Sequence, residues 1–393
     1  MNKVIIVGGD HYNALGIVRC FGINGIKPYG ILTTNSKKEK DNFCYSSKYW
    51  EQYWFALSDD EALEILKSYF SNEDVKPVLV PSSDGMALLI DLHLDELSEH
   101  FICPSINRKQ GEIAKLMDKS HQVEWAKQLG IRTAKTWCVN LNVSLEHFYN
   151  EVFFPCIAKP VISSEGQKTD ITKCENLDDL RKCMKEIQSK GYHRILVQEF
   201  LKKDYEAELF GCIGEHSDKI PYLFSKHVRE WPPVGGSVSY HKFLKTPELI
   251  SQAERLLRKI KEYGYVGNID IELFVIKGEL VLNEVNFRNS GDVYACFQHK
   301  VYYPYFSYLD MIGCDTSSLN VDYTTDKCAM NETTDFRHVL FGDLSLKEWL
   351  RYKRMCGDYA YYFKGDMKPA WKKYRYFLNK YFSSDYDKIP YTA

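Results

Sequence analysis

The sequence lacks any pair of cysteines with the spacing of a metal knuckle or a redox motif. Its 12 cysteines are scattered over 393 residues, and no two of them form a C-x-x-C pair. This pattern argues against a disulfide scaffold and against a zinc knuckle. We therefore expect reduced thiols in a cytoplasmic protein.

Long apolar runs are also missing. Runs such as KVIIVGG and PVLVPSS are far shorter than the roughly 20 residues that span a bilayer, and no apolar stretch follows the N-terminal Met. The formal net charge of −2 gives no reason to expect a nucleic-acid partner. With 45% hydrophobic and 14% aromatic residues, the chain can nevertheless bury large cores. Its length fits roughly two to four domains.

The N-terminal part, about residues 1–105, alternates short apolar runs with segments of helical spacing. The expected strands are KVIIVGGD, KPYGILTT and KPVLVPSSD, and the expected helices are YNALGIVRCFGINGI, DEALEILKSYF and GMALLIDLHLDEL. This order predicts a parallel α/β sheet with ligands at the carboxyl ends of its strands. The turn GGDHYNALG lacks the G-x-G-x-x-G motif, so we interpret it as a tight turn rather than a dinucleotide site.

The middle of the chain has a different pattern. A helix is expected from Lys115 to Gly130, followed by strands in FFPCIAKP and TDITKC, a helix in NLDDLRKCMKEIQSKG, and strands in RILVQEFL and YEAELFGCIG. The order strand, strand, helix, strand indicates an α+β unit. Further strands surround a helix in PELISQAERLLRKIKEYG.

Two of these later strands carry polar side chains on one face. Alternation along a strand places Asp270 and Glu272 together, and likewise Glu284, Asn286 and Arg288. The short link IKGE predicts a hairpin, in which Glu272 and Glu284 would converge. Two carboxylates that close repel each other unless a cation lies between them. Carboxylate and amide oxygens suit Mg²⁺, but a solvated salt-bridge face explains these residues equally well.

Three further segments carry candidate nucleotide contacts. Lys119 stands at a helix start in LMDKS, and Lys159 ends an apolar strand in CIAKP. A lysine that ends a buried strand needs an anion, unless its side chain reaches solvent. The segment LVQEFLKKDYE can bind an adenine edge through its backbone, or it is only a strand end and a turn.

The order of these motifs resembles the ATP-grasp superfamily over roughly residues 1–313. The resemblance rests on DK at a helix start, AKP closing a strand, QEFL followed by an acid, and IE paired with NEVNFR. Within the superfamily the chain looks most like carboxylate–amine ligases related to D-aspartate ligase and to the carbamoyl phosphate synthetase large chain. The loop VREWPPVGGS is similar to a loop of that branch.

The resemblance implies a role for each of several residues. Seven would hold ATP: Lys119, Lys159, Glu199, Phe200, Leu201, Asp204 and Glu206. Three would hold Mg²⁺ or Mn²⁺: Glu272, Glu284 and Asn286. Three would act in catalysis: Arg288, Arg229 and Lys159. Glu206 and Glu208 are alternatives to Asp204 for the ribose, and Lys226 is a weaker catalytic candidate.

The resemblance also implies an architecture that mixes α/β and α+β structure in an ATP-grasp fold. A pre-ATP-grasp α/β domain would cover residues 1–105, and an ATP-grasp domain would cover 106–313. Within the latter, a lid subdomain would span about 133–203, and the hinge and catalytic sheet about 204–313. Residues 314–393 would form a C-terminal extension.

The implied function is an ATP-dependent carboxylate–amine, or carboxylate–thiol, ligase. It would form an acyl phosphate from a small acid such as an amino acid and join it to an amine, in cell-envelope or peptide-like metabolite synthesis. A catalytically weak ATP-binding regulatory protein and a carbamoyl-phosphate-type ligase are the alternatives. The loops at 162–168 and 229–240 would close over the site. The sequence departs from the family in having one glycine in ISSEGQKT and Phe287 before the final arginine.

The end of the chain is basic and aromatic. Residues 346–393 hold 11 Lys and Arg against 5 Asp and Glu, with 14 aromatic residues. Trp371, Tyr374, Leu378 and Phe382 recur at helical spacing. We interpret this segment as a helix whose aromatic face packs on the body. Contact of residues 366–393 with a membrane surface or an anionic precursor, and a homodimer, stay open.

Overall fold

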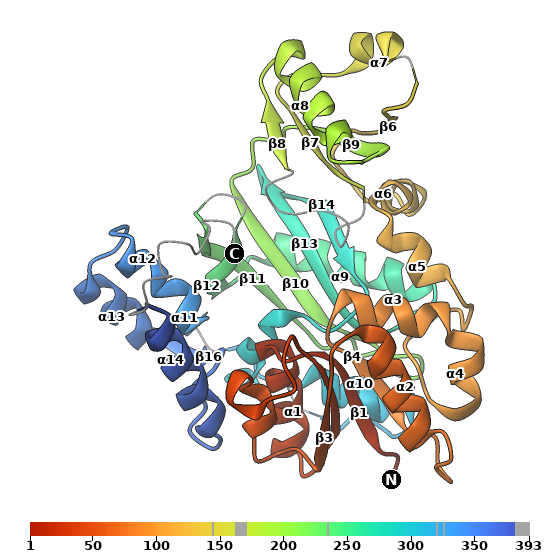
Figure 1. The fold of residues 1–393 in the computed structure, drawn as a ribbon, viewed down its shortest axis with the longest axis vertical. Helices are drawn as coiled ribbons and strands as arrows, with labels where there is room; N and C mark the ends of the chain where they lie inside the picture. Colours follow the sequence, from red (N-terminus) through yellow and green to blue (C-terminus); the bar gives the residue numbers. More distant parts are fainter. Residues whose placement is uncertain (144, 162–170, 234–235, 320, 325–326, 382–393) are drawn as a thin grey trace.

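The protein is built around three β-sheets (Figure 1). The computed structural model describes residues 1–143, 145–161, 171–233, 236–319, 321–324 and 327–381. Across these residues, none of the helices combines the length and the apolar character that a membrane crossing requires. All 12 cysteines lie in this part of the chain and are free thiols.

The first sheet is parallel and has the strand order β3-β2-β1-β4, which confirms the predicted α/β domain. Its strands are β1 (Val4–Gly9), β2 (Tyr29–Thr33), β3 (Gln52–Ala56) and β4 (Val78–Pro81). The helices are α1 (Tyr12–Ile23), α2 (Asp59–Phe70), α3 (Asp84–Leu92) and α4 (Leu94–His100). The sequence analysis missed β3, a partly exposed edge strand, although its residues YWFA are apolar.

The second sheet is antiparallel, has the order β6-β9-β7-β8 and projects from the rest of the molecule (Figure 1). Its strands are β6 (Thr136–Asn140), β7 (Cys156–Pro160), β8 (Thr172–Cys174) and β9 (Arg194–Glu199). Helix α8 (Leu177–Ser189) buries Leu180, Met184 and Ile187 against it, and α7 (Glu146–Glu151) lies nearby. The predicted order of strand, strand, helix and strand is confirmed.

The third sheet is the largest and follows the order β14-β13-β10-β11-β12-β15-β16, with β5 paired to β13. Its strands are β5 (Ser105–Ile106), β10 (Tyr205–Ile213), β11 (Tyr222–Trp231), β12 (Ser237–Phe243), β13 (Tyr265–Ile276), β14 (Glu279–Asn286), β15 (Cys328–Met330) and β16 (Cys356–Tyr359). Helix α9 (Pro247–Glu262) packs five apolar side chains on one face: Leu249, Ala253, Leu256, Leu257 and Ile260. Since β15 and β16 lie after residue 313, the sheet crosses the boundary proposed there.

The single helix expected from Lys115 to Gly130 is in fact two helices, α5 (Glu112–Met117) and α6 (Lys119–Gln128). Asp118 between them has an extended backbone, and its side chain accepts a hydrogen bond from the Ser120 N–H. An aspartate in this position caps a new helix, so the chain turns there instead of continuing. Lys119 thereby becomes the first residue of α6.

The C-terminal helix α14 (Lys368–Tyr381) packs on the body as predicted, but through only part of the predicted face. Trp371 and Leu378 are 66% and 48% exposed, and Phe382 lies outside the described residues. Tyr374, which belongs to the predicted face, makes the contact together with Ala370, and the Tyr374 hydroxyl donates to the Glu332 carboxylate over 2.6 Å. Glu332 lies in α11 (Glu332–Asp335), so this polar partner, which spacing along α14 cannot reveal, decides which face turns inward.

Buried charge ties the C-terminal extension to α1. The Arg19 Nε donates to Asp366 over 3.1 Å, and the side chains are 0% and 2% exposed. Asp366 also accepts hydrogen bonds from the Ser47 hydroxyl and the Lys48 N–H. Because a buried ion pair breaks at a high cost in free energy, these contacts fix the extension against the N-terminal sheet.

Candidate functional site

Two carboxylates face each other on the hairpin formed by β13 and β14. Glu272 is directly opposite Glu284, and Asp270 is opposite Asn286, so the predicted hairpin and its facing carboxylates are confirmed. The turn has positive φ at Lys277 (51°) and Gly278 (80°). Two consecutive positive φ values give the tight turn whose twist matches the strands, and this turn pairs Ile276 with Glu279. A β-bulge between Glu272 and Leu273 then shifts the register by one residue and brings Glu272 opposite Glu284.

Two lysines from separate elements meet these carboxylates. The Lys119 ammonium, at the start of α6, lies 2.9 Å from the Glu284 carboxylate. Lys159, at the end of β7, is only 9% exposed, so it does not reach solvent as the alternative interpretation required. Burial, and secondly the charge of Lys119, lower the pKa of Lys159 to about 8, while Glu284 and Glu272 oppose the shift. The lysine is therefore held in a site that lacks enough anionic partners.

The pKa of Glu272 is shifted in the opposite direction. Burial, followed by the charges of Glu284, Asp270 and Glu208, raises the pKa of Glu272 to about 7. Asp270 is also buried, and within the described residues its Oδ1 atom has no hydrogen-bond partner. Opposed, desolvated carboxylates with an unpartnered oxygen lack positive charge, which a divalent cation would supply. The donor set of Glu272, Glu284 and Asn286 therefore fits Mg²⁺.

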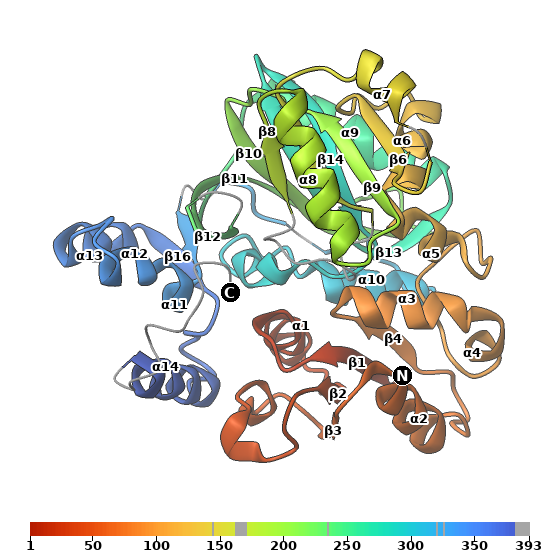
Figure 2. The same ribbon diagram turned by 45° about the horizontal axis from the view of Figure 1, so that its top comes forward.

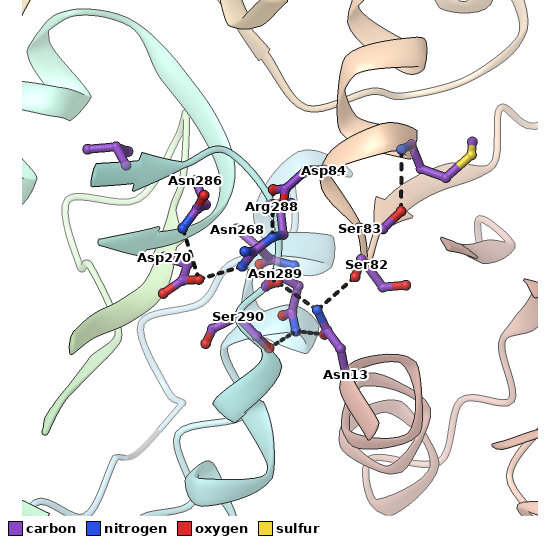
Figure 3. Close-up of polar contacts among 12 residues, drawn as sticks. Asn13, Ser82, Ser83, Asp84, Asn268, Asp270, Asn286, Arg288, Asn289 and Ser290 are labelled. Carbon is purple, nitrogen blue, oxygen red and sulfur yellow. Dashed lines mark hydrogen bonds and ion pairs between the residues drawn. The ribbon is translucent and has the colours of Figure 1, made fainter. Parts of the chain in front are cut away.

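Arg288 connects this sheet with the N-terminal domain (Figure 3). Its Nε donates to Asp84 over 2.9 Å, and its Nη1 atom forms a close ion pair with Asp270 and donates to the Asn289 carbonyl. Burial alone would lower the pKa of Arg288, but Asp270 and Asp84 raise it above its ordinary value. Asn286 also donates to Asp270, over 3.4 Å. Arg288 is thus fixed at the edge of the metal-ligand set.

A second set of contacts beside Arg288 holds the two domains together. Asn13, at the start of α1, donates from Nδ2 to the Ser82 and Asn289 carbonyls, each over 2.8 Å (Figure 3). Neither Asn13 nor Asp84 was assigned a role from the sequence. They lie more than 200 residues from Arg288 along the chain, and no local pattern marks such a pair.

The hinge between β9 and β10 has an ordered backbone. The Glu199 carboxylate accepts the Lys135 N–H over 2.7 Å, and the Glu199 N–H donates to the Lys135 carbonyl. The Phe200 N–H donates to the Pro155 carbonyl, and its ring, 38% exposed, lies 4.3 Å from the Lys173 ammonium. Within the described chain the Leu201 N–H has no backbone or side-chain acceptor. The predicted adenine-binding role of this segment stays a prediction.

The three ribose candidates lie in different surroundings. Asp204 is exposed and accepts the Lys277 N–H over 2.7 Å. Glu206 is half-buried, with the His227 Nδ1 atom 3.6 Å away, and Glu208 is buried, 3.5 Å from the other nitrogen of the same ring. Burial lowers the pKa of His227, but Glu208 and Glu230 outweigh it and raise the pKa to about 10. His227 therefore carries a positive charge beside two of the candidates.

Arg229 has a partner that the sequence analysis did not anticipate. It donates from Nε and Nη2 to the two oxygens of Asp335, both over 2.9 Å, and Asp335 is fully buried in α11. Lys226 lies with its ammonium 4.0 Å from the centre of the Tyr205 ring. Their catalytic roles stay predictions. The predicted closing loop at 162–168 lies outside the described residues, as do residues 234–235 of the second loop.

Comparison with known proteins agrees with this geometry. The ATP-grasp domain model matches residues 124–296. A formate-dependent phosphoribosylglycinamide formyltransferase of Methanocaldococcus jannaschii is 27% identical over 174 residues, which are 42% of each chain. A D-aspartate ligase of Enterococcus faecium is 24% identical over 241 residues, which are 58% of this chain and 56% of the relative. The chain thus matches only about half of each relative's length.

Solved structures extend the similarity beyond the matched domain. The N5-carboxyaminoimidazole synthetase of Staphylococcus aureus, solved with ADP, superposes with a TM-score of 0.66 over 88% of this chain and 87% of its own, at 14% identity. The fold is therefore shared even where the sequence similarity is low. Residues 124–296 thus match the ATP-grasp domain model, and the tertiary structure shares the fold of the N5-carboxyaminoimidazole synthetase.

Proposed function

We propose that this protein is an ATP-dependent ligase that activates a small carboxylic acid as an acyl phosphate and joins it to an amine. One observation carries the proposal: two lysines and two glutamates from two sheets and a helix lie close together. These residues are Lys119, Lys159, Glu272 and Glu284, and Arg288 lies at the edge of this cluster. Burial and like charges shift the pKa of Lys159 down to about 8 and that of Glu272 up to about 7, so the rest of the chain leaves these two charges incompletely compensated. A metal–triphosphate supplies both missing charges at once.

The residues divide into three tasks under this proposal. Lys119 and Lys159 would pair with phosphate oxygens, because a desolvated ammonium gains most from an anion. Glu272, Glu284 and Asn286 would hold Mg²⁺, or Mn²⁺, which would neutralise phosphate charge when bound. Before phosphate binds, Glu284 pairs with Lys119 over 2.9 Å, so nucleotide binding exchanges this contact for others.

Arg288 would stabilise the phosphoryl group in transfer. Asp84 and Asp270 hold the guanidinium in one orientation through separate nitrogens, which leaves its Nη2 atom without a hydrogen bond among the described residues. A pre-oriented cation needs no rearrangement as charge develops on the transferred group. The substrate carboxylate would attack the γ-phosphoryl group, and the amine would then displace phosphate to give the amide, ADP and phosphate.

The remaining assignments rest on the hinge and on the sheets. Glu199, Phe200 and Leu201 would hold the adenine, with the Leu201 N–H as a hydrogen-bond donor, and Asp204 or Glu206 would hold the ribose. We keep the domain division at residues 105 and 313 as a proposal, although β15 and β16 continue the large sheet past 313. The names of the relatives support carbon–nitrogen bond formation more than they support one substrate.

Turnover with a substrate panel tests the proposal. ADP release would be measured with ATP and Mg²⁺ against each of the common amino acids, alone and paired with a second amine. We expect ADP release that needs both an acid and an amine, and hydroxylamine should trap the acyl phosphate as a hydroxamate. ATP binding without turnover under any pairing would instead favour a regulatory ATP-binding protein.

A further inference from the structure

A second cavity, of about 800 Å³, lies at the carboxyl ends of the N-terminal sheet. Three segments that follow β1, β2 and β3 line it, namely residues 9–11, 33–36 and 57–59. Helix α14 closes the opposite side with Lys372, Lys373 and Tyr376, and Figure 2 shows this helix beside the N-terminal domain. The carboxyl edge of a parallel sheet is where α/β proteins bind ligands, and the volume suits a small molecule.

Lys373 is the unusual residue of this cavity. Its ammonium lies among aromatic rings, 4.9 Å from the centre of Phe43, 5.3 Å from Tyr361 and 5.9 Å from Tyr376. Within the described residues it donates no hydrogen bond and forms no ion pair. Burial lowers its pKa to about 8, with Asp10 opposing the shift. A desolvated ammonium without an acceptor costs free energy that an anionic ligand would recover.

Lys372, the neighbouring residue on α14, has hydrogen-bond acceptors for its ammonium group. Its ammonium donates to the Tyr45 hydroxyl and to the Glu39 carbonyl, and it lies 4.4 Å from the centre of the Tyr45 ring. The two adjacent lysines that line one wall of the cavity therefore differ in their hydrogen bonding. Lys372 attaches the helix to the body, whereas Lys373 points a spare positive charge at the cavity.

Asp10 supplies a carboxylate to the same cavity, and burial raises its pKa while the N–H groups of Phe43 and Cys44 oppose that rise. One of its oxygens accepts the Phe43 N–H over 3.0 Å, and the other accepts the Cys44 N–H over 2.8 Å. Both oxygens retain a lone pair, since a carboxylate oxygen accepts two hydrogen bonds. Asp10 makes no ion pair with Lys373 in the described chain. The cavity thus offers a separated cation and carboxylate, which suits a ligand with an anionic end and a hydrogen-bond donor.

We propose that this cavity, completed by α14, binds a small molecule through a carboxylate or phosphate group held by Lys373, with Asp10 accepting a donor of the same molecule. None of its lining residues is among those assigned to the metal or the nucleotide. The sheet order β3-β2-β1-β4 places the cavity at the β1–β3 ends, whereas Asp84, which binds Arg288, follows β4. The two sites share no residue but are neighbours, since the charges of Lys373 and Arg288 both contribute, after burial, to the lowered pKa of His11 in the cavity lining. Anion binding in the cavity does not depend on the proposed ligase activity.

Calorimetric titration of the full chain with inorganic phosphate, and separately with succinate, tests the proposal. We expect saturable binding of at least one anion, weakened at least tenfold by Lys373→Met. The matched variant Lys368→Met removes an exposed charge from the same helix, outside the cavity, and should leave the affinity unchanged. Which anion binds distinguishes a carboxylate from a phosphate ligand.

Phosphate could instead bind at the ATP site, and Lys159→Met separates the two sites. If Lys159→Met abolishes anion binding and Lys373→Met does not, the proposal is wrong. It is also wrong if neither anion binds saturably to the wild-type chain. Should Lys373→Met fail to fold, ¹³C-methylated wild-type lysines give the same answer by NMR. The Lys373 methyl signal should then move on addition of the bound anion, and an unmoved signal would contradict the proposal.

Discussion

Glu284→Gln should separate the effect of the metal site on ligand binding from its effect on stability. The wild-type carboxylate of Glu284 makes two interactions with opposite effects on the stability of the folded protein. It pairs with Lys119 over 2.9 Å, with side-chain exposures of 15% and 18%. It also repels Glu272 directly across the hairpin, and after burial it is the largest cause of the raised pKa of Glu272, about 7. The substitution removes both interactions.

The two contributions to stability nearly cancel. A partly buried ion pair is worth about 1–2 kcal/mol, between the values for exposed and fully buried pairs. The whole pKa shift of Glu272 corresponds to roughly 3 kcal/mol, with burial as its largest cause and Glu284 as the second, so the repulsion that the substitution relieves is of the same order as the lost ion pair. The net change in the free energy of unfolding is therefore within about 1 kcal/mol, and the melting temperature should move by less than about 4 °C.

Ligand binding should respond much more strongly, since no other group replaces the lost charge. We expect the Mg²⁺-dependent gain in ATP affinity, measured by calorimetry with Mg²⁺ and with EDTA, to fall at least tenfold. Turnover should fall about 100-fold, or ~2.7 kcal/mol of barrier. Glu279→Gln makes the same change on the same strand, at a carboxylate that is 63% exposed and paired with Arg132, and should leave both unaltered. A folded Glu284→Gln protein with more than about a tenth of wild-type turnover would refute the metal assignment.

Three further predictions concern charge in the two halves of the molecule. Because the pKa of Lys159 is lowered to about 8, its buried charge costs stability below pH 8, and the free energy of unfolding should rise between pH 8 and 10.5. ATP affinity should fall over the same interval as the ammonium is lost, and Lys159→Arg should remove that fall; a flat wild-type titration would contradict the phosphate role. Asp366→Asn leaves the buried Arg19 without its charge partner, so urea unfolding should show a loss of about 3 kcal/mol or more. Asp335→Asn breaks the bidentate ion pair with Arg229, so the free energy of unfolding should fall by about 3 kcal/mol for the same reason. An unfolding curve like that of the wild type would show that this pair does not stabilise the fold.

Much of the fold could be predicted because its signals are local. Alternation with a period of two set the faces of β13 and β14, and the short link with Gly278 predicted the hairpin. The turn alone would place Glu272 opposite Asn283, and a β-bulge between Glu272 and Leu273, which the sequence did not reveal, brings Glu272 opposite Glu284. The parallel N-terminal sheet followed in the same way from apolar runs that alternate with helical segments. The edge strand β3 was missed, because a short apolar run such as YWFA, without alternation, does not by itself distinguish a strand from a helix.

The site as a whole required the tertiary structure. Lys119 and Lys159 belong to different elements. Packing of α6 against β14 brings the Lys119 ammonium to Glu284, and the position of β7 brings Lys159 near the same carboxylates. Asp84 reaches Arg288 across more than 200 residues of chain, and such partners leave no periodic signal.

The sequence by itself therefore determined the elements, their faces and the acidic hairpin, since these depend on neighbours within a few residues. The tertiary structure decided which distant charges pair. Arg229 binds Asp335 of the C-terminal extension, and α14 turns Tyr374 inward while Trp371 stays exposed. Both outcomes depend on buried carboxylates elsewhere in the chain, whose desolvation must be compensated by whichever donor the packing brings within reach.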